Sequence, residues 1–243
     1  MAWLFDMLGA LTLLYPKRCV LCEQPCKEGS PVQPFQDVAH ICAACLALLP
    51  HNNKACNTCA LPLQLEESVQ CGQCLGKQPI WASAHALWRY ESQAQWLIQH
   101  YKYAKAYYLD RSFSALLAAY ADRLLQDQFD AVVPVPMHKR RWVSRGFNQA
   151  EVLARAVAKQ LDLPLLAREV ERVKNTPRFA AGQDKKARRR AIKGAFRVNA
   201  DMPDRLLIVD DVKTTGATSE ELARVLLQAG AKSVSVLVLA RTS

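Results

Sequence analysis

Uninterrupted hydrophobic runs separated by polar turns characterise the last two thirds of the chain. Residues 206–209 are four consecutive aliphatic side chains, which is typical of a strand buried on both faces, as in a parallel sheet. The next segment repeats apolar residues at helical spacing, so we expect a helix opened by Thr218 or Ser219 and closed by Gly230. Further strands are expected over 81–90, 129–136, 163–172, 195–198 and 233–239, and further helices over 93–108, 112–126 and 150–160. Strands that alternate with helices in this way predict an α/β fold with a parallel sheet and flanking helices.

The first third of the chain has a different pattern, with little periodicity and many Pro, Asn, Gln and Cys residues. We place a boundary near residue 79, which divides the chain into a cysteine-rich module (1–79) and an α/β domain (80–243). The apolar start, 1–15, lacks a basic leader and contains Asp6, so we expect an amphipathic helix there, with contact to a membrane surface as the alternative. No run is long enough for a transmembrane helix.

Eight of the nine cysteines form Cys-x-x-Cys pairs, whose thiolates suit tetrahedral zinc. The pairs are Cys19/Cys22, Cys42/Cys45, Cys56/Cys59 and Cys71/Cys74. We expect two zinc sites with four cysteine ligands each, most simply from the first two pairs and the last two, with interleaved pairing as an alternative and Cys26 left over. A redox role for one pair is less favoured, because four pairs occur in succession. Structural zinc indicates a reducing compartment and therefore the cytoplasm, with attachment at the inner membrane as a variant.

The hydrophobic run 206–209 leads directly into two acids and a short loop, Asp210 to Thr218. Ligands of open α/β sheets bind at the carboxyl ends of the strands, where this loop is expected. Threonine hydroxyls, backbone N–H groups and a helix N-terminus suit a phosphate, whereas two carboxylates suit sugar hydroxyls or a metal ion. Together these groups describe a site for a ribose 5-phosphate. The alternative is an ordinary turn with two solvated aspartates.

The stretch LLIVDDVKTTGAT, residues 206–218, resembles at every position the binding motif of the type I phosphoribosyltransferases. In that family the loop holds the 5-phosphate of phosphoribosyl pyrophosphate, and the acids bind the ribose hydroxyls. The resemblance therefore implies a phosphoribosyltransferase-like fold that binds this ligand with Mg²⁺. It makes Asp210 and Asp211 the candidate catalytic residues. The implied binding residues are Asp210, Asp211, Lys213, Thr214, Thr215, Gly216, Ala217 and Thr218.

Positive charge is concentrated in one segment of the chain. The formal net charge is +10, and residues 139–193 alone contain 16 Lys and Arg against 5 Asp and Glu. Part of this segment follows the strand expected at 129–136, where the phosphoribosyltransferases bind pyrophosphate. We expect a pyrophosphate loop there, with a solvated basic loop as the alternative. Its candidate residues are His138, Lys139, Arg140, Arg141 and Arg145.

A second basic run, 185–193, is expected to form a short helix with cations on adjacent faces. Cations that track a phosphate backbone, beside an aromatic ring on which a base can stack, are typical of binders of single-stranded nucleic acid. Phe179 could supply that ring, and Trp142 and Phe147 are further candidates unless they are buried. The candidate residues are Arg178, Lys185, Lys186, Arg188, Arg189, Arg190 and Lys193. A solvated charged face is the alternative.

Several motifs together resemble the ComF family, which is associated with DNA uptake in natural transformation. They are the cysteine pairs, PVPMH (134–138), RGFNQA (145–150), KGAF (193–196) and IQHYKY (98–103). The resemblance implies a cytoplasmic zinc protein that handles incoming single-stranded DNA and meets DNA-uptake or recombination proteins. The run 175–190 departs from the pattern: Gln183 is displaced and Ala191 stands where an Asn is expected. A catalytic loop lies roughly there in phosphoribosyltransferases, so this departure leaves turnover open.

Three hypotheses follow. The protein is a DNA-handling module that binds phosphoribosyl pyrophosphate, or an active phosphoribosyltransferase with an unidentified acceptor, or a zinc-ribbon interaction protein with an inactive fold. The complete motif at 210–218 favours the first two. An acceptor pocket and an oligomeric state are not indicated by any motif.

Overall fold

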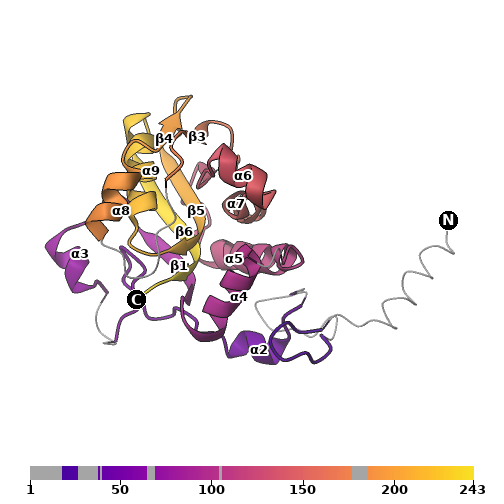
Figure 1. The fold of residues 1–243 in the computed structure, drawn as a ribbon. Coiled ribbons are helices and arrows are strands. Elements are labelled where there is room, and N and C mark those ends of the chain that lie inside the picture. The colour runs from indigo at the N-terminus through magenta and orange to yellow at the C-terminus, as the bar shows by residue number, and fades with distance from the viewer. Residues whose placement is uncertain (1–17, 27–37, 39, 65–68, 104–105, 177–184) are drawn as a thin grey trace.

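The computed structural model describes residues 18–26, 38, 40–64, 69–103, 106–176 and 185–243 (Figure 1). The amphipathic helix expected over 1–15 lies outside these described residues, as do Arg178, Phe179 and Gln183. Among the helices of the described part, none is long and apolar enough to cross a membrane.

A four-stranded parallel sheet forms the centre of the molecule (Figure 1). Its strands are β1 (Ala84–Arg89), β2 (Ala131–Pro134), β5 (Arg205–Lys213) and β6 (Ser233–Arg241), in the order β1-β6-β5-β2. Leu206 and Ile208 of β5 belong to the hydrophobic cluster on one face, and Leu207 and Val209 to the cluster on the other. Burial on both faces explains why the aliphatic run of this strand shows no alternation.

Helices cover both faces of the sheet. α4 (Ser92–Tyr103), α5 (Leu109–Leu125) and α7 (Gln149–Gln160) lie on one side, and α8 (Lys185–Ile192) and α9 (Ala217–Gln228) lie on the other (Figure 1). The α/β fold class predicted from the sequence, a parallel sheet with flanking helices behind a cysteine module, is therefore confirmed. The helix expected to open at Thr218 or Ser219 begins slightly earlier, at Ala217, because Gly216 adopts a left-handed conformation with φ of 79° and reverses the chain there.

Two expected strands do not join the parallel sheet. β3 (Val170–Arg172) and β4 (Phe196–Val198) pair antiparallel with each other and form a separate two-stranded sheet. Within the expected strand 163–172, residues 163–169 are irregular, apart from one isolated bridge between Leu165 and Val132. At this bridge the Val132 N–H donates to the Pro164 carbonyl at 2.9 Å and the Leu166 N–H donates to the Val132 carbonyl at 2.8 Å.

Two other boundaries also differ from expectation. β5 continues through both acids to Lys213, because its last residues pair with β6 up to Arg241. The basic segment after β2 contains a helix, α6 (Lys139–Arg145), where a loop was expected. His138 caps this helix by accepting a hydrogen bond from the Arg140 N–H at 3.2 Å, and Gly146, with φ of 87°, ends it.

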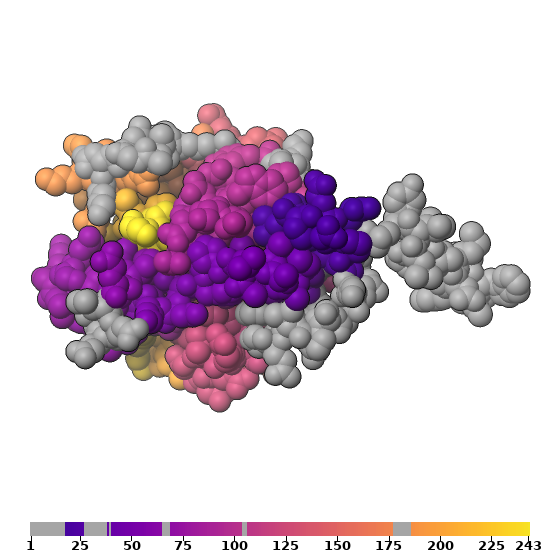
Figure 2. Space-filling model, turned by 90° about the horizontal axis from the view of Figure 1, so that it is seen from below, coloured from indigo at the N-terminus to yellow at the C-terminus, as the bar shows by residue number. Residues whose placement is uncertain are grey.

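The cysteine-rich part packs directly against the sheet domain (Figure 2). It contains α2 (Ala43–Ala47) and α3 (Gly72–Gly76). Leu46 and Leu49 are buried in the same hydrophobic cluster as Trp88 of β1, and the Arg89 N–H donates to the Pro50 carbonyl at 2.8 Å. This part therefore contributes apolar side chains to the common core, in addition to its metal-binding pattern. The boundary at residue 79 stays a prediction.

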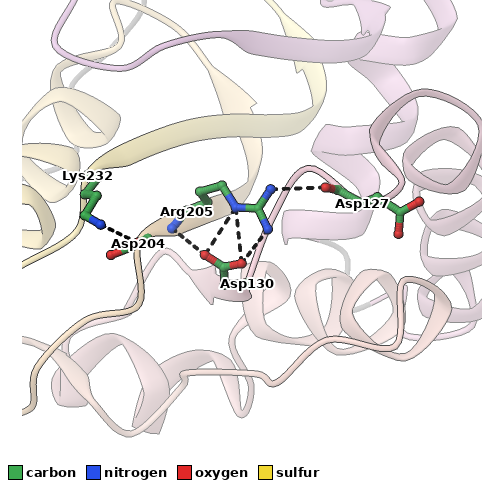
Figure 3. Close-up of polar contacts among 5 residues, drawn as sticks. All are labelled: Asp127, Asp130, Asp204, Arg205 and Lys232. Atoms are coloured by element: carbon green, nitrogen blue, oxygen red, sulfur yellow. Dashed lines mark hydrogen bonds and ion pairs between the residues drawn. The ribbon is translucent and has the colours of Figure 1, made fainter.

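Ion pairs connect residues at the amino-terminal end of the sheet strands (Figure 3). Arg205, at the start of β5, lies 2.7 Å from Asp130, and Lys232 lies 2.7 Å from Asp204. Arg205 also donates to the carbonyl of Asp127 at 3.2 Å. These carboxylates are satisfied locally. Asp210 and Asp211 lie toward the opposite, carboxyl-terminal end of β5.

Candidate functional site

Two clusters of four cysteines satisfy the geometry of tetrahedral zinc. Within each cluster, all four sulfur atoms lie within 4.8 Å of one another. Zinc–sulfur bonds of about 2.3 Å in a tetrahedron place the sulfurs about 3.8 Å apart. The Sγ atoms of Cys22 and Cys42 are 3.7 Å apart, and those of Cys59 and Cys71 are 3.6 Å apart. The first cluster is Cys19, Cys22, Cys42 and Cys45, and the second is Cys56, Cys59, Cys71 and Cys74, which confirms the simple pairing of the knuckles.

The knuckle backbones favour the thiolate at Cys19 and Cys56, whereas burial and neighbouring thiols raise the pKa of Cys45 and Cys74. Burial raises the pKa of Cys56, but backbone N–H groups of Cys71, Cys59 and Thr58 outweigh it and lower the pKa to about 6. The same balance lowers the pKa of Cys19 to about 7. Zinc binds the thiolate form, so both clusters fit structural zinc ions. Burial and the neighbouring thiols of the first cluster raise the pKa of the remaining Cys26.

The two acids of β5 form a coupled pair with a lysine from another element. Nζ of Lys102, on α4, lies 2.8 Å from Oδ1 of Asp211, and the Asp211 N–H donates to Oδ1 of Asp210 at 2.9 Å. Burial and the charge of Asp211 raise the pKa of Asp210 to about 7, although Lys102 and Arg172 oppose this shift. Asp210 is therefore only partly ionised near neutral pH.

Two arginines meet at Thr176, and one of them, Arg172, lies near Asp210. Nη2 of Arg172 donates to the Thr176 hydroxyl at 2.5 Å, and Arg141 donates to the carbonyl oxygen of the same residue. Burial and the charge of Arg141 lower the pKa of Arg172 to about 10, and its Nε has no hydrogen-bond partner within the described residues. Adjacent guanidinium groups repel each other unless an anion lies between them, so this arrangement suits a polyphosphate.

The loop between β5 and α9 provides the phosphate-binding pattern. Nη1 of Arg188, on α8, donates to the Thr214 hydroxyl at 3.2 Å. The Thr215 hydroxyl accepts from the Ala217 N–H at 3.4 Å, and the remaining N–H groups in the first turn of α9 lack intrahelical partners, as in every helix. These N–H groups and the helix dipole favour an anion beside Gly216.

Several predicted residues lie elsewhere. The Lys213 ammonium is turned toward the second cysteine cluster, 3.2 Å from the Cys59 carbonyl oxygen. His138 caps α6, and Arg145 donates to Gln149 at 2.9 Å while its guanidinium lies over the ring of Tyr103. Lys139 and Arg140 are exposed on α6. Among the predicted pyrophosphate residues, Arg141 therefore lies beside Arg172, and the others lie on or around α6.

The predicted nucleic-acid residues of α8 and the turn after it divide into two groups. Arg188 contacts the phosphate loop, and Arg189 pairs with Glu220 of α9 at 2.9 Å. Lys186, Arg190 and Lys193 are exposed. Arg178 and the side chain of Lys185 lie outside the described residues.

Sequence reasoning did not assign Lys102 or Arg172 to the site. Lys102 belongs to the IQHYKY stretch, which the ComF resemblance pointed to without giving it a role. The sequence around Lys102 has one distinctive feature: residues 92–109 contain no acidic residue. Arg172 had no comparable local signal.

Comparisons with known proteins agree on one family. Residues 10–75 match the family model described as a double zinc ribbon domain. Competence protein F of Haemophilus influenzae is 34% identical over 195 residues, covering 76% of this chain and 84% of that protein. DNA utilization protein YhgH of Escherichia coli K12 is 32% identical over 95% of this chain and 99% of its own. Competence protein ComFC of Streptococcus pneumoniae is 27% identical over 92% of this chain and 100% of that protein.

Solved structures similar to this chain include phosphoribosyltransferases. A purine phosphoribosyltransferase from Pyrococcus horikoshii matches with a TM-score of 0.33 and 22% identity, over 51% of this chain and 70% of that chain. A UMP synthase from Leishmania donovani matches with a TM-score of 0.34 over 57% of this chain and 23% of that one. At these scores the likeness is coarse, so the functional argument depends on the residues described above.

Proposed function

The chain belongs to the ComF family of competence and DNA utilization proteins, and from this premise we propose that it binds phosphoribosyl pyrophosphate with Mg²⁺ and handles incoming single-stranded DNA in the cytoplasm. The observation that carries the proposal is the succession of groups along β5 and the loop after it. Asp210 and Asp211 lie on the strand, and the Thr214–Gly216 loop leads into the first turn of α9. Two carboxylates that suit sugar hydroxyls are thereby followed directly by a loop that suits a phosphate, which supports the proposal.

Each part of the ligand has matching groups in this account. The 5-phosphate binds the N–H groups and hydroxyls of residues 214–218, with Arg188 at the edge. The ribose hydroxyls bind the two aspartates, one of which forms an ion pair with Lys102. Arg141 and Arg172 face the pyrophosphate, whose charge Mg²⁺ also neutralises.

Calorimetric titration tests this assignment part by part. Mg²⁺ with phosphoribosyl pyrophosphate, ribose 5-phosphate and pyrophosphate are titrated separately into the wild-type protein. The double variant Asp210→Asn/Asp211→Asn should lose binding of the first two ligands and keep both zinc ions. Asp204→Asn, at the other edge of the sheet, is the matched control and should bind as the wild type does. Unchanged binding by the double variant would contradict the assignment.

Single-stranded DNA has two candidate surfaces. One consists of the exposed cations Lys186, Arg190 and Lys193 at α8. The other consists of exposed aromatic rings along 96–108: Trp96, Tyr103, Tyr107 and Tyr108, which expose between 43% and 62% of their surface. Trp96 stacks on His100 with the ring centroids 4.8 Å apart, and Arg145 lies over Tyr103. Exposed rings beside cations suit stacking of bases along a strand.

Oligonucleotide binding by two variants separates these surfaces. Arg190→Ala/Lys193→Ala should weaken binding and reduce its salt dependence. Trp96→Ala/Tyr103→Ala should weaken binding while leaving the salt dependence nearly unchanged. Lys232→Ala removes an exposed charge at the amino edge of the sheet and serves as the control. Wild-type affinity in both double variants would exclude both surfaces.

Transfer of the ribosyl group to an unidentified acceptor is the second candidate function. The pKa of Asp210, raised to about 7, lies where a general base is effective. Release of pyrophosphate that depends on both an added acceptor and Asp210 would favour this function. Binding without release, for every small-molecule acceptor tested, would favour the first.

A further inference from the structure

We propose that the second cysteine cluster, Cys56/Cys59/Cys71/Cys74, positions the phosphate-binding loop, so that loss of its metal weakens binding of the phosphorylated ligand whereas loss of metal from the first cluster does not. The inference rests on the proposed function, because it concerns the regulation of that same site. It identifies Trp81, Lys213 and Arg241 as positioning residues that connect a zinc knuckle to the loop.

The connection begins at two backbone carbonyls of the Cys56–Cys59 knuckle. The carbonyl of Thr58 accepts a hydrogen bond from the indole N–H of Trp81 at 2.7 Å. The carbonyl of Cys59 accepts from Nζ of Lys213 at 3.2 Å and from Nε of Arg241 at 3.3 Å. Thr58 lies between two metal ligands and Cys59 is itself a ligand, so the direction of both carbonyls depends on the closed knuckle.

The same three side chains also contact the phosphate-binding loop or one another. Arg241 donates from Nη1 to the carbonyl of Lys213 at 3.2 Å and to the carbonyl of Thr214 at 2.5 Å. The ring of Trp81 lies so close to Gly216 that a Cβ atom added there would be 3.0 Å from the ring. The Lys213 ammonium lies 4.5 Å from the centre of the Trp81 ring. The knuckle, these side chains and the loop therefore form one continuous contact.

Burial and charge make this contact specific. Trp81, Lys213 and Arg241 expose only 6%, 3% and 8% of their surfaces. A zinc ion with four thiolates carries a net charge of −2, which compensates the two cations that face it in the interior. A buried cation without compensation is costly, so loss of the metal should loosen the positions of Lys213 and Arg241 and, with them, the loop.

The first cluster lies in a different environment. α2, which contains Cys45, lies beneath α4, whereas α3, which contains Cys74, lies on the α8 side of the sheet (Figure 1). Cys45 packs against the hydrophobic cluster of α4, α5 and α7, and the second cysteine cluster belongs to the cluster that includes Ala217 of α9. The two metal sites therefore provide a matched comparison within one protein.

Paired cysteine variants test the proposal in the full chain. Cys71→Ser/Cys74→Ser removes two ligands from the second cluster without altering the knuckle that carries the carbonyls, and Cys42→Ser/Cys45→Ser is the counterpart in the first. Zinc content should fall by one ion in each. In Cys71→Ser/Cys74→Ser, affinity for Mg²⁺ with phosphoribosyl pyrophosphate should fall between about 5- and 150-fold, the range typical of coupled sites. In Cys42→Ser/Cys45→Ser, this affinity should stay near that of the wild type. Equal losses, or none in either, would overturn the proposal.

Hydrogen exchange provides a second readout that does not depend on ligand affinity. Amide exchange over 213–218 should accelerate in the second-cluster variant alone, while exchange in α5 stays at the wild-type rate. Trp81→Phe should keep both zinc ions and leaves an aromatic ring at this position, but it loses the hydrogen bond to Thr58 and the indole atom beside Gly216, and should weaken binding by about two- to tenfold. Wild-type affinity and wild-type exchange in Trp81→Phe would contradict the connection. Failure of the wild-type protein to bind would refute the proposed function, whereas the exchange result would still decide the inference.

Discussion

Lys102 and Asp211 form an ion pair of 2.8 Å between α4 and the end of β5. Both side chains are largely buried, with exposures of 16% and 14%. The contact is central to the site, because it makes the two adjacent carboxylates electrostatically different. Asp211 is paired with a cation, whereas Asp210 lies next to the charge of Asp211, which contributes to its raised pKa.

Replacement of Lys102 by Met should destabilise the protein at pH 8 by about 3 kcal/mol, as expected when one partner of a buried pair is removed. The loss should be smaller at pH 5, because Asp210, whose pKa is about 7, is then protonated and no longer repels Asp211. Urea unfolding at the two pH values measures the difference, with Lys102→Arg as the charge-preserving control. Equal destabilisation at both pH values would contradict the contribution assigned to the charge of Asp210.

Binding of Mg²⁺ with phosphoribosyl pyrophosphate should strengthen as the pH rises from 6 to 8. The folded-state pKa of Asp210 is raised to about 7. At pH 6 the group must therefore lose a proton before it accepts a hydrogen bond from a ribose hydroxyl or a metal-bound water. Calorimetry across this range, in two buffers of different ionisation enthalpy, gives the proton count. The ligand has its own titration, so Asp210→Asn is the reference, and an identical pH profile in this variant would contradict the assignment.

Substitution of Gly216 by Ala should impair both folding and phosphate binding. The residue has φ of 79°, and an added Cβ would lie 3.0 Å from Trp81, so the loop would have to shift. We expect a loss of stability of about 1–3 kcal/mol. Gly72→Ala is the matched control, because nothing lies within 4 Å of the added atom there. Thermal unfolding and binding would be compared in the two variants, and equal behaviour would argue against a tight loop.

Arg188 and Arg190 should have separable roles although both lie on α8. Arg188 donates to Thr214, so Arg188→Ala should weaken binding of ribose 5-phosphate. Arg190 is exposed, so Arg190→Ala should affect only binding of single-stranded DNA. Titration of each variant with each ligand makes the comparison. A loss of DNA binding in Arg188→Ala with ribose 5-phosphate binding intact would return Arg188 to the nucleic-acid surface predicted from the sequence.

The local parts of this structure could be predicted from the sequence, because their signals are contained in short stretches. The run 206–209 and the loop after it predict strand, turn and helix, and the spacing of the cysteine pairs predicts the two metal clusters. Lys102 could not be placed, because it lies more than a hundred residues from Asp211 and only the packing of α4 brings them together. The side chain of Lys213 could not be placed for a similar reason, since its burial beside Cys59 depends on tertiary contacts.

The antiparallel pair β3 and β4 shows the same limit. Hydrophobic runs do not reveal which strands pair, so the sequence pattern did not predict that 170–172 and 196–198 pair with each other outside the central sheet. Arg172 reaches the site from β3, so the same limit hid a cation of the site.

The most direct test of the central claim is calorimetric titration of the zinc-loaded wild-type protein with phosphoribosyl pyrophosphate and Mg²⁺, with and without a single-stranded oligonucleotide. The account predicts one ligand bound per chain, with an affinity that the oligonucleotide changes. The ligand should change the affinity for the oligonucleotide by the same factor, because coupling is reciprocal. Binding that the oligonucleotide does not change would move the account toward an enzyme with a small-molecule acceptor, and no binding would contradict the proposed site.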